Sequence, residues 1–184
     1  MKIVMLGSPG SGKGTQAKLL VEKLGIPQVS TGDLLRAEVA SGSDLGAQLK
    51  ATMAAGELVT DDVVLTMLKA RLAADDCANG YILDGFPRNV AQAQTLRTML
   101  LEIGQPVDRA ILIQVDEEEI LRRILSRAEG RADDNEETVR HRMSVYHSQT
   151  APVIDFYRKL DVLREIEGVG SVDDIFAGVF AALA

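Results

Sequence analysis

Short apolar runs alternate with longer amphipathic segments along the whole chain. The apolar runs are continuous, and we predict them to be strands: residues 3–6, 27–30, 81–84, 110–115 and 162–166. The amphipathic segments predict helices over residues 13–24, 31–41, 44–55, 60–74, 90–103, 117–127, 136–160 and 172–183, the long one bending near Pro152. This alternation is typical of a parallel sheet covered by helices on both faces, with ligands at the carboxyl ends of the strands.

The chain is predicted to form one domain. Its 184 residues contain no internal repeat and no low-complexity linker, and the polar residues 129–135 predict a loop. The apolar run near the start has four residues, too few for a signal-peptide core or a membrane span, and no later run approaches the length of a span. We therefore expect a soluble, cytoplasmic protein with no membrane partner.

Net charge and cysteine content reduce the number of functions that the chain can have. The formal net charge is -7, which disfavours a nucleic-acid partner held on a basic surface. Of the 20 basic residues, 13 are arginine, whose planar fork suits bidentate binding of phosphate. The single cysteine, Cys77, excludes an internal disulfide and a thiolate zinc site. This high share of arginine in an acidic protein predicts that the arginine side chains gather in one cleft.

The segment Gly7-Ser8-Pro9-Gly10-Ser11-Gly12-Lys13-Gly14-Thr15 follows a predicted strand and opens a predicted helix. Glycines at this spacing let backbone N–H groups turn toward one anion, and the helix N-terminus adds its positive end. Lys13 supplies a full charge for the outer phosphates of a nucleotide. A plain turn between strand and helix is the alternative. The spacing and the flanking elements favour an α/β fold of the P-loop NTPase type.

The magnesium ligand of this loop is predicted to differ from the general pattern. A hydroxyl residue usually follows the lysine, whereas here Gly14 stands there and Thr15 comes one position later. Asp84, at the end of a predicted strand, is then the candidate that holds Mg²⁺ through water. Capping of the turn at Gly85 is the alternative role for this carboxylate.

Arginines recur at predicted strand ends, loops and helix faces. Taken singly, each is more often a solvated surface residue. Phosphoryl transfer, however, mainly requires that the protein position the two reactants and place positive charge beside the transferring oxygens. A ring of arginines supplies both. The candidates are Arg36, Arg88, Arg123, Arg127, Arg131 and Arg142.

Four motifs resemble the adenylate kinase family nearly from end to end. They are the phosphate loop through Gln16, the segment 30–36, the Asp84-Gly85-Phe86-Pro87-Arg88 run and the segment 130–138. The resemblance implies a core (1–29, 60–125, 137–184), a small helical monophosphate-binding insertion (30–59) and a short lid loop (about 126–136). It also implies that Mg²⁺ is used with ATP.

The resemblance implies a role for each matching residue. The implied ATP site is Gly10, Ser11, Gly12, Lys13, Gly14, Thr15, Arg123, Arg127 and Gly170. The implied AMP site is Thr31, Arg36, Glu57, Leu58, Val59, Gly85, Phe86, Pro87, Arg88, Gln92, Arg131 and Arg142. The implied catalytic group is Lys13, Arg88, Arg127, Arg131 and Arg142, with Asp84 at the metal. Glu57 stands where many relatives have lysine, and we expect its backbone to act.

The few residues between Arg127 and Asp133 predict a short lid loop, and the four-cysteine zinc lid of some relatives is impossible with Cys77 alone. Asp133 and Asp134 are implied to anchor lid arginines, capping of the next helix being the alternative. His141 and His147 lie on a predicted helix with no second ligand pair, so we interpret both as structural or surface residues.

The resulting hypothesis is reversible in-line transfer of the ATP terminal phosphoryl to AMP, giving two ADP, by a monomeric enzyme. A phosphate dianion is itself a nucleophile, so no general base is required. A UMP/CMP kinase of the same fold is the nearest alternative, although Thr31 and Gln92 favour adenine. Two alternatives belong to other classes of protein. One is a nucleotide switch, although the guanine-reading Asn-Lys-x-Asp segment is absent from this sequence; the other is a binding module without catalysis.

Overall fold

The computed structural model describes residues 1–126 and 135–184. In this described part, five parallel strands form one sheet in the order β2-β3-β1-β4-β5. Their bounds are β1 Lys2–Leu6, β2 Gln28–Ser30, β3 Tyr81–Asp84, β4 Arg109–Gln114 and β5 Leu163–Glu167. The predicted parallel sheet is confirmed. The strand order reverses direction beside β1, which is where ligands bind in open sheets of this kind.

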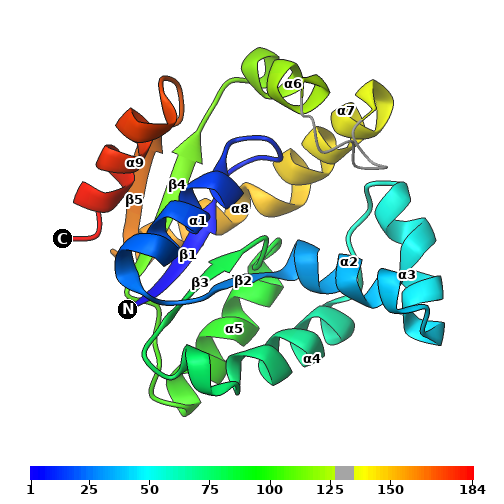
Figure 1. The fold of residues 1–184 in the computed structure, drawn as a ribbon, viewed down its shortest axis with the longest axis horizontal. Helices are drawn as coiled ribbons and strands as arrows, with labels where there is room; N and C mark the ends of the chain where they lie inside the picture. Colours follow the sequence, from blue (N-terminus) through cyan, green and yellow to red (C-terminus); the bar gives the residue numbers. More distant parts are fainter. Residues whose placement is uncertain (127–134) are drawn as a thin grey trace.

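Helices cover both faces of the sheet (Figure 1). Their bounds are α1 Lys13–Leu24, α2 Thr31–Ser41, α3 Asp44–Ala54, α4 Asp61–Leu72, α5 Val90–Glu102, α6 Glu117–Leu125, α7 Glu136–Val145, α8 Pro152–Lys159 and α9 Val172–Ala181. The helices α1 and α9 pack on one face, and α4, α5 and α8 pack on the other. The predicted helices therefore form, with ends that differ by a few residues.

The central strand β1 shows why its residues 3–6 are all apolar. Ile3 and Met5 belong to the core under α1 and α9, while Val4 and Leu6 belong to the core on the opposite face. Successive side chains of a strand point to opposite faces, so a strand covered on both sides needs apolar residues at every position. The edge strand β5 is partly exposed and carries charged residues.

Side-chain caps begin several of the helices. The Ser30 hydroxyl accepts a hydrogen bond from the Asp33 amide (3.2 Å), and the Asn89 side chain accepts one from the Gln92 amide (2.8 Å). Equivalent caps are made by Ser43, Asp116, Asn135 and Ser171. Each cap satisfies a backbone N–H that has no partner inside its helix. The helix starts are thus determined locally.

The bend predicted near Pro152 begins earlier in the structure. A π-helical turn, η2 (Tyr146–Thr150), separates α7 from α8, and Pro152 is the first residue of α8. Proline has no N–H to donate, so it is tolerated at the start of a helix and not in its interior. A short 3-10 turn, η1 (Asp75–Cys77), follows α4 and was not predicted.

The helices α2 and α3 project away from the sheet, and α4 leads the chain back to it (Figure 1). Leu35 of α2 and Leu49 of α3 are buried in the same core cluster as Val64 of α4. The projecting pair is therefore anchored by apolar packing at its base, and it overhangs the carboxyl end of the sheet.

Candidate functional site

The loop between β1 and α1 is shaped by glycines. Gly7, Gly10 and Gly12 have φ values of 141°, 81° and 97°, a region that other residues rarely adopt. A Cβ atom at Gly10 would lie 2.7 Å from Cγ1 of Ile124, because α6 packs directly on the loop. Gly10 is thus required both by its backbone conformation and by the neighbouring helix.

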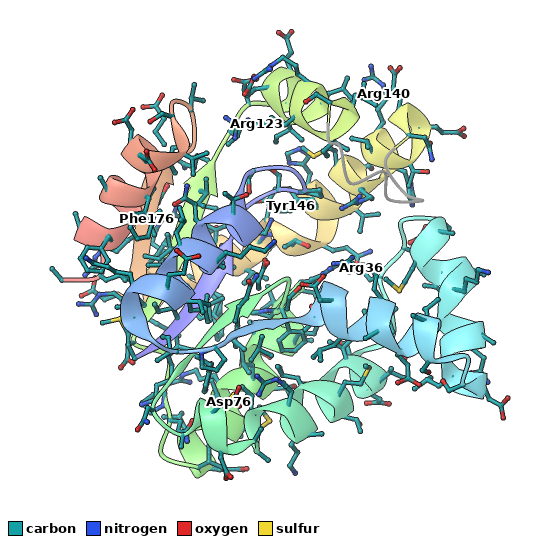
Figure 2. All side chains as sticks on the ribbon, in the orientation of Figure 1. Arg36, Asp76, Arg123, Arg140, Tyr146 and Phe176 are labelled. Atoms are coloured by element: carbon teal, nitrogen blue, oxygen red, sulfur yellow. The ribbon has the colours of Figure 1, made fainter. Side chains whose placement is uncertain are left out.

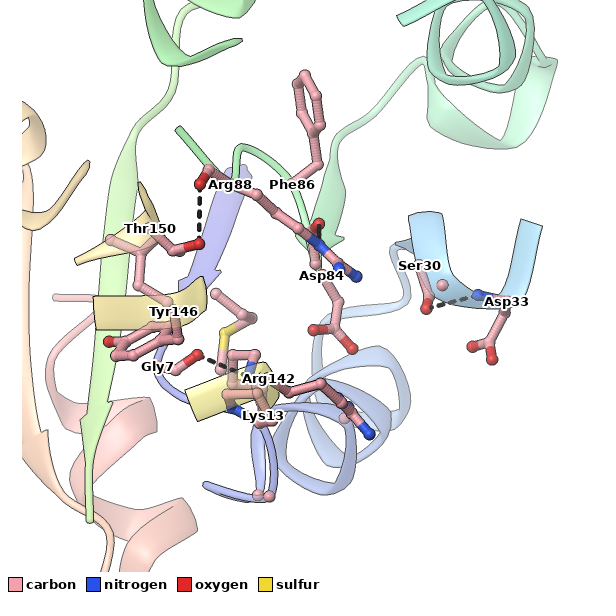
Figure 3. A pocket seen from close by; sticks show the side chains of 18 of the residues that line it. Gly7, Lys13, Ser30, Asp33, Asp84, Phe86, Arg88, Arg142, Tyr146 and Thr150 are labelled. Atoms are coloured by element: carbon pink, nitrogen blue, oxygen red, sulfur yellow. Dashed lines mark hydrogen bonds between the residues drawn. The ribbon is translucent and has the colours of Figure 1, made fainter. Parts of the chain in front are cut away.

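Lys13 is the first residue of α1 and lies inside the turn of this loop. Its Nζ donates hydrogen bonds to the carbonyl oxygens of Gly7 and Ser8, both at 2.8 Å. Figure 3 shows the bond to Gly7. The positive end of α1 and the ammonium group therefore share one small region, which suits an anion. The geometry is that expected of a nucleotide phosphate site.

Asp84 ends β3 beside this loop. In the register of the sheet it lies opposite Met5 on one side and Ser30 on the other. Its Oδ2 accepts a hydrogen bond from Nε2 of Gln28 at 2.9 Å, so within the described residues the carboxylate bonds a side chain of the next strand and does not cap the Gly85 turn. A Cβ at Gly14 would lie 3.5 Å from the same oxygen, which places the carboxylate next to the start of α1.

A cleft of about 590 Å³ opens over these groups. It lies between the phosphate loop, the ends of β2 and β3, and the turn η2. Lys13, Asp84, Arg88 and Arg142 surround the same space in Figure 3. Oxygen ligands suit Mg²⁺: nucleotide phosphates would provide them, and the Asp84 carboxylate would hold the ion through water.

A smaller cavity of about 70 Å³ lies beside the cleft, under α2. Thr31 Oγ1 donates a hydrogen bond to the Gly85 carbonyl at 2.9 Å, and Nε of Arg88 donates to the same oxygen at 2.7 Å. Both cavities are lined by Gly32, Arg36, Gly56, Leu58, Gly85, Phe86, Arg88 and Arg142. The two spaces therefore share arginines at their boundary.

Arg36 and Arg142 approach that boundary from different elements. Arg36 on α2 pairs with Oδ1 of Asp33 at 2.5 Å. Arg142 on α7 packs against the loop between α3 and α4, since a Cβ at Gly56 would lie 2.8 Å from its Cγ. Arg36 and Tyr146 both line the cleft, whereas Asp76 and Phe176, also labelled in Figure 2, do not. The structure thus gathers Lys13, Arg36, Arg88 and Arg142, as predicted.

The predicted AMP residues Thr31, Glu57, Leu58, Val59, Gly85, Phe86, Arg88 and Gln92 all line the smaller cavity, whereas Pro87 lines the larger cleft. Gln92 is 2% exposed, and its Oε1 accepts from the Arg88 amide at 2.6 Å. Its Nε2 donates to Oδ1 of Asp61 at 2.6 Å. The sequence indicated Gln92 for this site but gave no role to Asp61.

Arg123 lies at the turn around Gly168, two residues before Gly170. Nη2 of Arg123 donates to the Gly168 carbonyl at 2.9 Å, and its Nε donates to Oε1 of Glu119 at 2.6 Å. A hydrogen bond from Arg122, and to a smaller extent one from Arg123, lowers the pKa of Glu119 to about 2. Neither Arg123 nor Gly170 lines the 590 Å³ cleft, and the buried Ser11 does not line it either.

Sequence reasoning missed the residues that η2 brings to the cleft. Tyr146 and Thr150 line it, and Thr150 Oγ1 donates to the Arg88 carbonyl at 2.8 Å. Burial raises the pKa of Tyr146. A π-helical turn has no period in the sequence that distinguishes it from an α-helix, so the sequence carries no signal for these positions.

The predicted lid residues Arg127, Arg131, Asp133 and Asp134 lie outside the described residues. Within residues 1–126 and 135–184, no group of three or more His, Cys, Asp or Glu side chains is placed to hold a metal ion. Over the same described ranges, no helix is long and apolar enough to cross a membrane.

Comparisons with known proteins agree with this geometry. A family model described as adenylate kinase matches residues 5–162. A relative named adenylate kinase from Stenotrophomonas maltophilia (strain R551-3) is 55% identical, with 100% of this chain and 99% of the relative covered. One from Thermobifida fusca (strain YX) is 49% identical, covering 100% and 98%. One from Thermodesulfovibrio yellowstonii is 48% identical over 212 positions, covering 100% and 99%.

Proposed function

Because this chain belongs to the adenylate kinase family and is therefore a phosphotransferase, we propose that it transfers the terminal phosphoryl of ATP to AMP, reversibly, giving two ADP. One observation carries the assignment of the two sites. The cleft at the phosphate loop and the smaller cavity under α2 share Arg36, Arg88 and Arg142 at their boundary. Two phosphate groups, one in each space, would meet between these arginines.

The donor nucleotide is assigned to the 590 Å³ cleft. Lys13 and the amides of Gly10 to Thr15 bind its phosphates, since the ammonium group and the start of α1 lie in one place. Arg123 and Gly170 lie near the turn at Gly168, and we assign them to the adenine side. Arg127 completes the donor site in this proposal.

The acceptor is assigned to the smaller cavity, with its phosphate on Arg36 and Arg88. The AMP phosphate is a dianion and attacks the terminal phosphorus directly, so the residues need only align the two groups and balance charge. Arg142 faces the same boundary, and we assign Arg131 to the transferring group as well. Arginine at these positions stabilises charge as it develops on the transferring oxygens.

Magnesium fits the donor set beside the phosphate loop. Asp84 would hold it through water, because the carboxylate lies at the strand end beside Gly14. The ion, when bound with ATP, balances charge on the phosphate oxygens. Gln28 fixes the carboxylate through the hydrogen bond at 2.9 Å.

Water competes with AMP as the acceptor, so the site must close around both nucleotides. We propose that residues 30–59 form the monophosphate-binding unit, that about 126–136 form a short lid, and that 1–29, 60–125 and 137–184 form the core. The projection of α2 and α3 from the sheet supports the first assignment (Figure 1). We also propose a cytoplasmic monomer, since one chain supplies both cavities.

The deciding experiment is an assay of the purified chain with Mg-ATP and AMP, UMP, CMP or GMP in turn. We expect AMP to have by far the highest kcat/KM. Higher kcat/KM with UMP or CMP would reassign the enzyme to the pyrimidine branch of the fold, and no transfer to any monophosphate would overturn the proposal. Lys13→Ala is the control that should remove transfer while the chain stays folded.

A further inference from the structure

The side-chain amide of Gln92 is held from two sides. Its Nε2 donates to Oδ1 of Asp61 at 2.6 Å, and its Oε1 accepts from the backbone N–H of Arg88 at 2.6 Å. Asn89 caps α5 by accepting from the Gln92 amide N–H at 2.8 Å, and its own side chain donates to Asp61 at 3.4 Å. Gln92 is 2% exposed, so these contacts are shielded from water.

These two partners allow only one orientation of the amide. A carboxylate accepts hydrogen bonds and a backbone N–H donates them. Rotating the amide by half a turn would place Oε1 against the Asp61 carboxylate and Nε2 against the Arg88 N–H. Both contacts would then be unfavourable in a buried place, where an unpaired polar group is costly.

The fixed amide has one N–H and one oxygen lone pair left for a ligand. Gln92 lines the smaller cavity together with Leu35, Val59 and Val64, which are buried apolar residues. Adenine presents a donor at its 6-amino group and an acceptor at N1, which such an amide can pair. A 6-oxo purine presents an acceptor at O6 and a donor at N1, and only the rotated amide would pair with it.

We propose that Asp61 is a positioning residue that sets the donor and acceptor order of Gln92 and so makes the acceptor site select a 6-amino purine over a 6-oxo purine. This inference rests on the proposed function. Asp61 lines neither cavity, and it acts through Gln92. A site built to pair one hydrogen-bond pattern rejects the opposite pattern more strongly than an apolar pocket does.

The test compares AMP with inosine monophosphate, which keeps the purine shape and replaces the 6-amino group by an oxo group. In Asp61→Asn the side chain can donate as well as accept, so residue 61 no longer opposes rotation of the Gln92 amide and only the Arg88 N–H still does. We expect the ratio of kcat/KM for AMP to that for inosine monophosphate to fall about 10-fold relative to the unaltered chain. Asp61→Ala leaves room for water, which can donate or accept a hydrogen bond at the Gln92 amide, so this variant should shift the ratio in the same direction. It serves as the test if Asp61→Asn does not fold.

Asp62→Asn is the matched control, because Asp62 is the exposed neighbour in the same first turn of α4. It removes the same charge near the helix start and should leave the ratio unchanged. A purely structural role of Asp61 would lower kcat/KM for both nucleotides equally, and an unchanged ratio in both Asp61 variants overturns the inference. Failure of the unaltered chain to phosphorylate AMP would instead overturn the proposed function, and this inference with it.

Discussion

Nε2 of His141 lies 2.7 Å from Oε1 of Glu57, which joins α7 to the loop that leads from α3 to α4. Next to this pair, a Cβ at Gly56 would lie 2.8 Å from Cγ of Arg142, so the same loop packs on the helix that carries Arg142. From the sequence we expected the backbone of Glu57 to act at the site and His141 to be a structural or surface residue. In the structure their side chains connect the loop beside the smaller cavity to α7.

Replacing His141 by Ala should weaken AMP binding and leave ATP binding nearly unchanged. The two side chains are 44% and 51% exposed, and an exposed side-chain contact of this kind contributes up to about 1 kcal/mol, or about 5-fold in a KM. Steady-state kinetics with AMP varied at saturating ATP measures the effect. His147→Ala is the matched control, because His147 lies 2.7 Å from Glu117 in an exposed pair away from the acceptor side. Equal KM values for AMP in the two variants would contradict the prediction.

Arg88→Ala should raise the KM for AMP by about 10- to 100-fold and lower kcat as well. Arg88 lines both cavities, and its loss would remove a positive charge beside the acceptor phosphate and leave that phosphate less well aligned. The KM for ATP should change much less. Arg88→Lys restores the charge without the planar fork, so it should recover only part of the loss. A variant with normal AMP kinetics would remove Arg88 from the acceptor site.

Arg131→Ala should lower kcat at least about 100-fold, since a lost charge contact at a transferring group typically costs about 3 kcal/mol. The assignment comes from the family resemblance. If the arginine contacts the phosphoryl only in the transition state, kcat falls while the free energy of unfolding barely changes. Kinetics and a denaturation curve on the same preparation check both parts. A near-normal kcat would show that the proposed lid assignment is wrong.

Magnesium and zinc should behave differently. Removing Mg²⁺ should abolish phosphoryl transfer, because the ion balances charge on the ATP phosphates. Chelating zinc should leave the thermal midpoint unchanged, since Cys77 is the chain's single cysteine and cannot build a thiolate site alone. Metal analysis together with thermal unfolding tests this, and stoichiometric zinc in the purified protein would refute it. Asp84→Asn should raise the Mg²⁺ concentration that half-saturates activity.

Acid should weaken α6 through Glu119. Its pKa is lowered to about 2 by hydrogen bonds from Arg122 and Arg123, against an ordinary value of 4.5. A lowered folded-state pKa adds stability above the ordinary value, and that stability is lost as the pH falls toward 2. Glu119→Gln lacks this contribution. The difference in free energy of unfolding between the unaltered chain and the variant should therefore shrink from pH 5 to pH 3, and it should be smaller in high salt. A constant difference would contradict the assignment.

Local patterns in the sequence determined the elements and the phosphate site. The glycines and Lys13 predicted the loop because its geometry depends on neighbours within a few residues. The helix starts at Thr31 and Val90 were predicted at the residues where the structure has them, and side-chain caps from Ser30 and Asn89 support both starts. Continuous apolar runs predicted strands covered on both faces, and β1 shows the reason in its two opposed cores.

Tertiary packing alone decided which distant residues meet. The order of the strands places β2 beside β3 and so brings Gln28 to Asp84. The turn η2 brings Thr150 to Arg88, and the packing of α4 near α5 brings Asp61 to Gln92. Periodicity and capping report on contacts within a few residues of the chain, whereas these pairs lie 56, 62 and 31 residues apart. They form only when the sheet and its covering helices assemble, and for that reason no motif in the sequence predicted them.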